Sequence, residues 1–249
     1  MVTMDTLNYV ALSHQKALRR QLDLVANNIA NMNTAGYKRE NAIFETYLEK
    51  MDSSLTDSAK PVSFVLDQGF AHDTTAGDLI PTNEPTDVAL VGEGYFTIRT
   101  EDGQIAYTRN GNFRISDEGY LVTDSGAQVM SDGEQPIQFT PQETDFHIAS
   151  DGTVSSNLGP RGRLLVTAFE SEVQMKKIGA SMMTGEGGKA LPPEEVKLKS
   201  GVIEGSNVKP VIELADMIEI LRAYQSTTRL LDKYDDIRQR GIEKLGRVQ

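Results

Sequence analysis

The chain contains no cysteine and no tryptophan, and only 6% of its 249 residues are aromatic. Without cysteine it can form neither disulfides nor thiolate metal sites. Few aromatic side chains argue against a stacking platform for nucleic acid or sugar. No run of about 18 or more apolar residues occurs, so we expect no membrane span. The segment Met1–Gln21 is polar and amphipathic, so we also expect no cleaved secretory signal peptide.

Residues that could carry catalysis or bind a metal are also sparse. The three histidines, His14, His72 and His147, have no second histidine or carboxylate at a ligand spacing. No G-x-S-x-G nucleophile motif is present. Gly185–Lys189 is rich in glycine but lacks the spacing of a phosphate-binding loop. We therefore predict no catalytic residue, no metal, no cofactor and no small-molecule substrate, and the chain is not predicted to be an enzyme.

The charge is concentrated in the centre of the chain. Residues 1–60 and residues 201–249 each carry equal numbers of acidic and basic side chains. Residues 61–200 carry ten Lys or Arg and twenty-one Asp or Glu, which accounts for the whole net charge of −11. An acidic centre disfavours nucleic acid and anionic lipid as partners. Neutral ends can pack against copies of themselves without accumulating repulsion.

The N-terminal segment has the apolar period of an α-helix. Apolar residues recur at steps of three and four from Leu7 to Met32, and no proline or glycine precedes Gly36, which is predicted to end the helix. Residues 24–37 carry no charge and include four asparagines. Two interpretations stay open: these amides pair with neighbouring helices and set their register, or they form a solvated polar face.

The C-terminal segment from Val211 to Gly246 has no proline and only one glycine in its interior. Its apolar residues form a near-heptad stripe, which predicts a long helix that pairs with the N-terminal helix as a coiled coil. This pairing closes a loop of about 180 residues, so we expect both ends to be frayed in an isolated monomer and to order on assembly.

The centre has the pattern of antiparallel sheet. Turn signals such as Asp102-Gly103, Asn110-Gly111 and Glu118-Gly119 recur about every eight residues. Between them lie short strand-like segments, including 88–91, 95–100, 105–109, 113–115, 120–123 and 127–130. The predicted fold class is mainly β with long α-helical termini, with an antiparallel barrel- or sandwich-like central domain and a coiled coil of the N- and C-terminal helices.

These patterns also predict a domain division. Residues 1–36 form a helix paired with the helix 211–249, and the two make an axial core domain. Residues 37–85 are a connector, residues 86–200 a β-rich outer domain, and residues 201–210 a return linker.

Three blocks of sequence resemble the bacterial flagellar rod and hook proteins. The first is Ala26–Asn31 followed by Asn33–Lys38. The second lies in the predicted sheet, at Asp87–Leu90, Gly92–Ile98, Tyr107–Gly111 and Leu121–Thr123. The third is Ser200–Val208, followed by Met217-Ile218 and Arg222–Tyr224. The blocks occur in the order of the family and span nearly the whole chain.

The resemblance implies a structural subunit of the flagellar basal-body rod, the drive shaft needed for motility. The length leaves the two rod proteins of intermediate size as the choice. The segments 148–154, 162–164 and 201–208 look more like the proximal-rod than the distal-rod protein, and a distal-rod protein is the alternative. Outside the family, a secreted β-domain adhesin or binding module is the other alternative.

The family also implies partners and a location. The partners would be the chain itself, neighbouring rod subunits and the flagellar type III export apparatus. The location would be the periplasmic rod, reached without a cleaved signal peptide. The terminal helices would line the axial tube, with the β domain outside them.

The predicted subunit-assembly residues come from the helical stripes, the asparagine run and the resembling blocks. They are Leu22, Val25, Asn27, Asn28, Ile29, Asn31, Met32, Asn33, Gly36, Tyr37, Ser206, Asn207, Val208, Leu214, Met217, Ile218, Leu221, Tyr224, Thr228 and Leu231.

Overall fold

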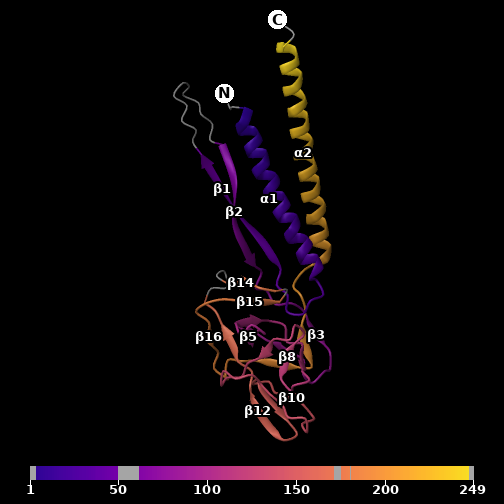
Figure 1. Cartoon of the computed structure of the whole chain (residues 1–249). Helices are drawn as coiled ribbons and strands as arrows, with labels where there is room; N and C mark the ends of the chain where they lie inside the picture. The colour runs from indigo at the N-terminus through magenta and orange to yellow at the C-terminus, as the bar shows by residue number, and fades with distance from the viewer. Residues whose placement is uncertain (1–3, 50–61, 171–174, 180, 247–249) are drawn as a thin grey trace. The chain divides into compact units, whose positions relative to one another are not determined.

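The computed structural model describes residues 4–49, 62–170, 175–179 and 181–246 (Figure 1). They form two compact units. The helical unit comprises the described parts of Met1–Ile29, Glu40–Ala71 and Lys209–Gln249, and the β unit those of Ala30–Arg39 and His72–Val208. The chain is mainly β with one long helix at each end, which confirms the coarse prediction of the fold class.

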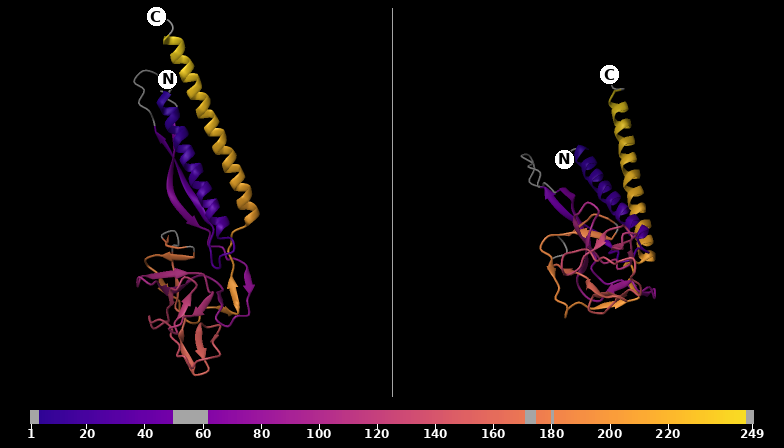
Figure 2. Two further views of the ribbon diagram at one scale, coloured as in Figure 1. Left: turned by 45° about the vertical axis from the view of Figure 1, so that its right-hand side comes forward. Right: turned by 60° about the horizontal axis from the view of Figure 1, so that its bottom comes forward.

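The helical unit contains both helices and one pair of strands. Helix α1 spans Met4–Ala30, and α2 spans Pro210–Gly246. Gln15 on α1 bonds to Thr228 on α2, and Asn28 bonds to Glu213, so the two helices run antiparallel (Figures 1 and 2). The N-terminal helix pairs with the C-terminal helix, as predicted. Coiled-coil packing of the two helices stays a prediction.

Helix α1 ends at Ala30, six residues before the predicted end at Gly36. Backbone N–H groups after Ala30 donate to acceptors other than the carbonyl oxygen four residues earlier. Thr34 N donates to Asn31 O at 3.1 Å, and Gly36 N donates to Glu204 O at 2.8 Å. The uncharged, asparagine-rich sequence is a weak helix former, so these bonds replace the last helical turns.

Helix α2 begins at a proline, as the geometry of a helix start allows. Pro210 occupies the first helical position, where a missing N–H removes no helical hydrogen bond. The N–H groups of Ile212 and Glu213 both donate to Lys209 O, at 3.0 and 3.1 Å. The acidic side chain of Glu213 in the first turn also suits the positive end of the helix dipole.

The predicted connector, residues 37–85, contains more regular structure than expected. Strands β1 (Glu40–Glu49) and β2 (Val62–His72) pair with each other as a two-stranded sheet. Both segments are rich in aromatic and β-branched residues, the composition of strands. The division of the chain into domains stays a prediction.

The β unit is built from short antiparallel strands. They are β3 (Leu79–Pro81), β4 (Val88–Leu90), β5 (Tyr95–Arg99), β6 (Ile105–Thr108), β7 (Phe113–Ile115), β8 (Leu121–Thr123), β9 (Gln128–Val129), β10 (His147–Ile148), β11 (Thr153–Ser156), β12 (Gly159–Arg163), β13 (Val166–Ala168), β14 (Lys176–Lys177), β15 (Met182–Thr184), β16 (Lys189–Ala190), β17 (Leu198–Ser200) and β18 (Val202–Glu204). The strands predicted at 95–100, 105–109 and 113–115 are confirmed to within one residue.

The largest sheet has the strand order β14-β15-β6-β5-β9-β8-β7, and β13 and β16 join it beside β5. Strands β10, β11 and β12 form a second sheet, and β17-β4 and β18-β3 form two ribbons. Among the described residues the strands close no barrel. The coarser expectation of an antiparallel β domain therefore holds, while the barrel- or sandwich-like arrangement is not confirmed.

Strand β5 separates two apolar clusters because its side chains alternate between the faces of the sheet. Phe96 and Ile98 lie in the main core, where Phe96 packs edge-on against Phe113 at 5.2 Å between ring centroids. Tyr95 faces the other way and joins a smaller cluster with Met175 and Met183. The opposite face of β5 is thus only partly covered.

Candidate assembly surface and junction block

The predicted assembly residues of α1 divide into buried and exposed sets. Val25 and Asn28 are buried, Leu22, Ile29, Asn31 and Met32 are half-buried, and Asn27 and Asn33 are exposed. The uncharged run therefore does not form one continuous buried amide face within the chain. The assembly role of the exposed Asn27 and Asn33 stays a prediction.

Asn28 is the buried amide, and its partners lie within the helical unit. Its Oδ1 accepts from Glu40 N and its Nδ2 donates to Glu40 O, both at 3.0 Å. Nδ2 also lies 3.1 Å from Oε2 of Glu213, which is fully buried. A donor–acceptor pair on one backbone residue fixes the orientation of the amide. Asn28 thus joins the end of α1 to the starts of β1 and α2.

Residues 33–39, which we call the junction block, belong to the β unit. Tyr37 is completely buried, and Nζ of Lys177 lies 4.0 Å from the centre of its ring. Gly36 is buried with a φ of +67°, and its N–H binds the backbone of Glu204. Gly36 and Tyr37, two residues of the first block that resembles the family, therefore pack inside the chain.

A buried ionic cluster holds the junction block to β18. Nζ of Lys38 lies 2.7 Å from Oε1 of Glu204 and donates to the carbonyl oxygen of Thr75 at 2.8 Å. Nη1 of Arg109 lies 3.6 Å from Oε2 of Glu204. All three charged side chains are buried. Because desolvated charges are stable only when paired, the cluster depends on the single carboxylate of Glu204.

Asn207 bridges the junction block and the segment after β2. Its Oδ1 accepts from Arg39 N at 2.7 Å, and its Nδ2 donates to Asp73 O at 2.8 Å and to Thr75 O at 3.1 Å. Val208 beside it is buried, and its N–H donates to the hydroxyl of Ser206. These three predicted assembly residues thus have an observed role within the β unit.

The segment that Asn207 binds contains Asp73, and hydrogen bonds shift the pKa of its carboxyl group. The hydroxyl of Thr75 and then its N–H donate to Asp73, at 2.7 and 3.0 Å, and these bonds lower the pKa of Asp73 below 3.8. A lowered pKa means that ionised Asp73 stabilises the fold above its ordinary pKa, and this stability is lost as the pH falls through the lowered value.

We expect Thr75→Val to raise the pKa of Asp73 towards its ordinary value, because the larger of the two stabilising hydrogen bonds is lost. The measurement is the carboxyl carbon chemical shift of Asp73 by NMR between about pH 2 and pH 6, a range centred near the usual Asp pKa. Thr153→Val is the control, since Thr153 makes the same pair of bonds to Asp151. An unchanged Asp73 titration in Thr75→Val would contradict the assignment.

Helix α2 exposes a stripe of large apolar side chains. Val211, Leu214, Ile218 and Leu221 are 80%, 50%, 51% and 38% exposed. Their steps of three and four place them along one face of the helix. The other predicted residues of α2, Met217, Tyr224, Thr228 and Leu231, are half-buried. The apolar residues of α2 therefore form two adjacent stripes. The half-buried stripe packs against the rest of the helical unit, and the exposed stripe faces solvent.

The sequence did not single out Lys38, Arg109 and Glu204 as a group. One feature of the sequence could have indicated the cluster: Glu204 is the single charged residue in the segment 201–208. A lone charge between apolar residues and glycines indicates a buried ion pair, but it does not identify the partner.

The described residues lack two features of other classes of function. They contain no group of three or more His, Cys, Asp or Glu side chains that could hold a metal ion. Within the same residues, neither helix has the length and apolarity needed to cross a membrane.

Three family models match the chain. The model of the flagella basal body rod protein matches residues 9–38, and the model of the flagellar hook protein FlgE/F/G D1 domain matches residues 89–156. The model of the flagellar basal body rod FlgEFG protein C-terminal region matches residues 199–244. The rod-protein model covers most of α1 and of the junction block, and the C-terminal model covers β18 and most of α2.

Curated relatives match over nearly the full length. The flagellar basal-body rod protein FlgF of Caulobacter vibrioides is 37% identical over 246 residues, which cover 98% of this chain and all of the relative. FlgF of Mesorhizobium japonicum is 31% identical, covering 96% and 97% of the two chains. FlgG of Agrobacterium fabrum is 29% identical, covering 92% and 95%.

The matching models and relatives are structural rod and hook proteins and not enzymes. The chain belongs to the flagellar basal-body rod proteins, and within them FlgF is favoured over FlgG. This membership decides against the secreted adhesin considered as an alternative.

Proposed function

We propose that the chain is a proximal-rod subunit that assembles through its terminal helices with copies of itself and with other rod subunits. Assembly would take place in the periplasm after transport through the flagellar type III export apparatus, without a cleaved signal. In this arrangement α1 and α2 pack as a coiled coil around the axis of the rod, and the β unit forms a barrel- or sandwich-like layer outside them.

The observation that carries the proposal is the exposed apolar stripe of α2. The side chains of Val211, Leu214, Ile218 and Leu221 occupy one face of a 37-residue helix and are about half exposed or more, except Leu221 at 38%. A contiguous apolar face of this kind marks a surface that becomes covered by a partner. Covering it with neighbouring helices would supply the hydrophobic free energy of assembly.

The neutral charge balance of the ends supports the same arrangement. Residues 201–249 contain eight acidic and eight basic side chains, so packed copies of α2 would not accumulate repulsion. The acidic residues of the chain's centre would be spread through the outer layer, where water and ions screen them.

We expect Ile218→Glu to abolish assembly without unfolding the chain. An exposed substitution changes the free energy of unfolding by about 0.5 kcal/mol or less. An unpaired carboxylate in a packed interface costs several kcal/mol, so incorporation should fall by about 100-fold or more. The measurements are swimming motility and the amount of the chain in isolated basal bodies, in cells that express only the variant.

Leu158→Glu is the matched control, since Leu158 is 62% exposed but lies in the turn between β11 and β12. It introduces the same charge on the β unit and should leave incorporation unchanged. Normal motility and normal basal bodies in Ile218→Glu would overturn the assembly proposal. Secretion of the variant into the medium in normal amount would show that export and assembly are separate steps.

A further inference from the structure

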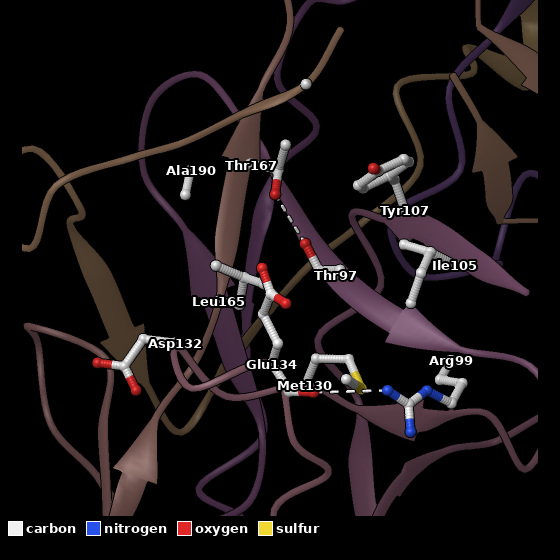
Figure 3. A pocket seen from close by; sticks show the side chains of 11 residues that line it. Thr97, Arg99, Ile105, Tyr107, Met130, Asp132, Glu134, Leu165, Thr167 and Ala190 are labelled. Atoms are coloured by element: carbon white, nitrogen blue, oxygen red, sulfur yellow. Dashed lines mark hydrogen bonds between the residues drawn. The ribbon is translucent and has the colours of Figure 1, made fainter. Parts of the chain in front are cut away.

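The β unit contains a pocket of about 500 Å³ on the face of β5 opposite the main core (Figure 3). Its walls come from β5, β6 and β13 and from the turn after β9. The apolar lining includes Ile105, Met130 and Leu165, and Tyr107 closes one side. The pocket lies beside the smaller apolar cluster, which covers the neighbouring part of the same face.

Two threonines form the polar part of the lining. The hydroxyls of Thr97 and Thr167 lie 2.8 Å apart, and both residues are buried. One hydroxyl donates to the other, so the pair presents further acceptor lone pairs and one more donor. In Figure 3 the carboxylate of Glu134 lies beside Leu165 and points towards this pair.

The rim of the pocket is net acidic. Asp132 and Glu134 supply two negative charges, and Arg99 supplies one positive charge. Nη2 of Arg99 donates to the carbonyl oxygen of Glu134 at 3.4 Å. Neither carboxylate forms a hydrogen bond or an ion pair with a side chain in the part of the chain that the structure describes. The pocket thus combines an apolar lining with two carboxylates at its rim.

This combination suits a lysine side chain. A lysine can lay its methylene stem along apolar surface while its ammonium group binds carboxylate and hydroxyl oxygens. We propose that the pocket receives a lysine from a second copy of this chain, supplied by the segment of Lys197 and Lys199 beside and within β17.

The β17 lysines complement the two carboxylates of the pocket in number and in charge. Lys197 and Lys199 are both exposed, and among the described residues neither forms an ion pair. They lie two residues apart in an extended segment, roughly 7 Å from each other, and they flank the buried Leu198. One of them can therefore enter the pocket while the other lies near its acidic rim.

The pocket and the β17 lysines are different surfaces of the same unit. A contact between them is heterologous, because it joins two different surfaces. Each copy can therefore supply its lysines to one neighbour and accept a lysine of another neighbour in its pocket. Repeated contacts of this kind build a ring or an open helical assembly. The contact would also offset the repulsion between acidic β units. This inference rests on the proposed function, in which copies of the chain lie next to one another.

Charge reversal tests the contact in the full-length chain carrying Ile218→Glu, which removes the contribution of the α2 stripe. Self-association is measured by sedimentation velocity at several protein and salt concentrations. We expect Asp132→Lys with Glu134→Lys, or Lys197→Glu with Lys199→Glu, to weaken self-association by about tenfold. The chain carrying all four substitutions should recover it.

Asp117→Lys with Glu118→Lys is the control, because it changes the net charge equally at exposed positions in the turn between β7 and β8. It should not weaken self-association. Equal association in all variants, or no recovery in the fourfold variant, would overturn the proposal. Loss of motility in the pocket variant without a change in self-association would also overturn it, since the pocket would then bind a different partner.

Failure of this contact is distinguishable from failure of the proposed function. If Ile218→Glu blocks rod assembly while charge reversal leaves self-association unchanged, only the pocket proposal is wrong. If Ile218→Glu leaves rods and motility normal, the assembly proposal itself is wrong.

Discussion

Glu204→Ala is expected to destabilise the β unit by about 3–5 kcal/mol, because it leaves two buried cations without their carboxylate. Lys38 and Arg109 both lose their ion-pair partner. The N–H of Gly77, which donates to Oε1 of Glu204 at 3.0 Å, loses its acceptor as well. A loss of this size is a large fraction of the stability of a typical domain. The measurement is urea unfolding followed by circular dichroism.

The control for Glu204→Ala is Glu170→Ala. Glu170 pairs with Lys189, but both side chains are exposed at 81% and 74%. Water screens this pair, so its loss should leave the urea midpoint unchanged. Equal effects of the two substitutions would contradict the conclusion that burial makes the Glu204 cluster important. Lys38→Met combined with Glu204→Leu should recover part of the stability, although Arg109 would remain without its carboxylate.

Gly36→Ala is the second substitution with a large expected effect. Gly36 has a φ of +67°, and an added Cβ would lie 2.2 Å from Asn110 N and 2.4 Å from Arg109 C. Both contacts are with backbone atoms, so relief requires the junction block to move away from the β6–β7 segment. We expect a loss of about 2–5 kcal/mol, from the left-handed backbone and from overpacking together.

Gly103→Ala separates these two contributions. Gly103 has a similar φ of +78°, but no atom lies within 4 Å of an added Cβ. It should therefore cost only about 1–2 kcal/mol, the penalty of the backbone conformation. Thermal unfolding of both variants gives the comparison. If Gly36→Ala were no worse than Gly103→Ala, the close packing of the junction block would not contribute to stability.

Local patterns in the sequence were sufficient for most of the secondary structure. The three- and four-residue apolar period predicted both helices, and the Asp-Gly and Glu-Gly turns predicted the hairpins of β5–β6 and β7–β8. These features depend on residues a few positions apart, which a sequence displays directly. The strands β1 and β2 were missed, although their composition is typical of strands.

The role of the asparagine run and of the junction block could not be predicted in the same way. Asn28 appeared to be one of four similar amides, yet it alone is buried, because Glu40 and Glu213 lie against it. Gly36 was expected as a helix end, and it is a point of close backbone contact instead. Nothing near these residues in the sequence distinguishes the two possibilities.

The sequence by itself determined the two helical ends, the antiparallel centre, the uneven charge and the resemblance to flagellar rod proteins. Only the tertiary structure decided which of the predicted assembly residues are already used within the chain, and which apolar side chains of α2 remain exposed. The reason is the separation of the partners: Asn28 and Glu213 are 185 positions apart in the sequence, and Lys38 and Glu204 are 166 positions apart. Burial of such pairs depends on how distant segments meet, which no local period encodes.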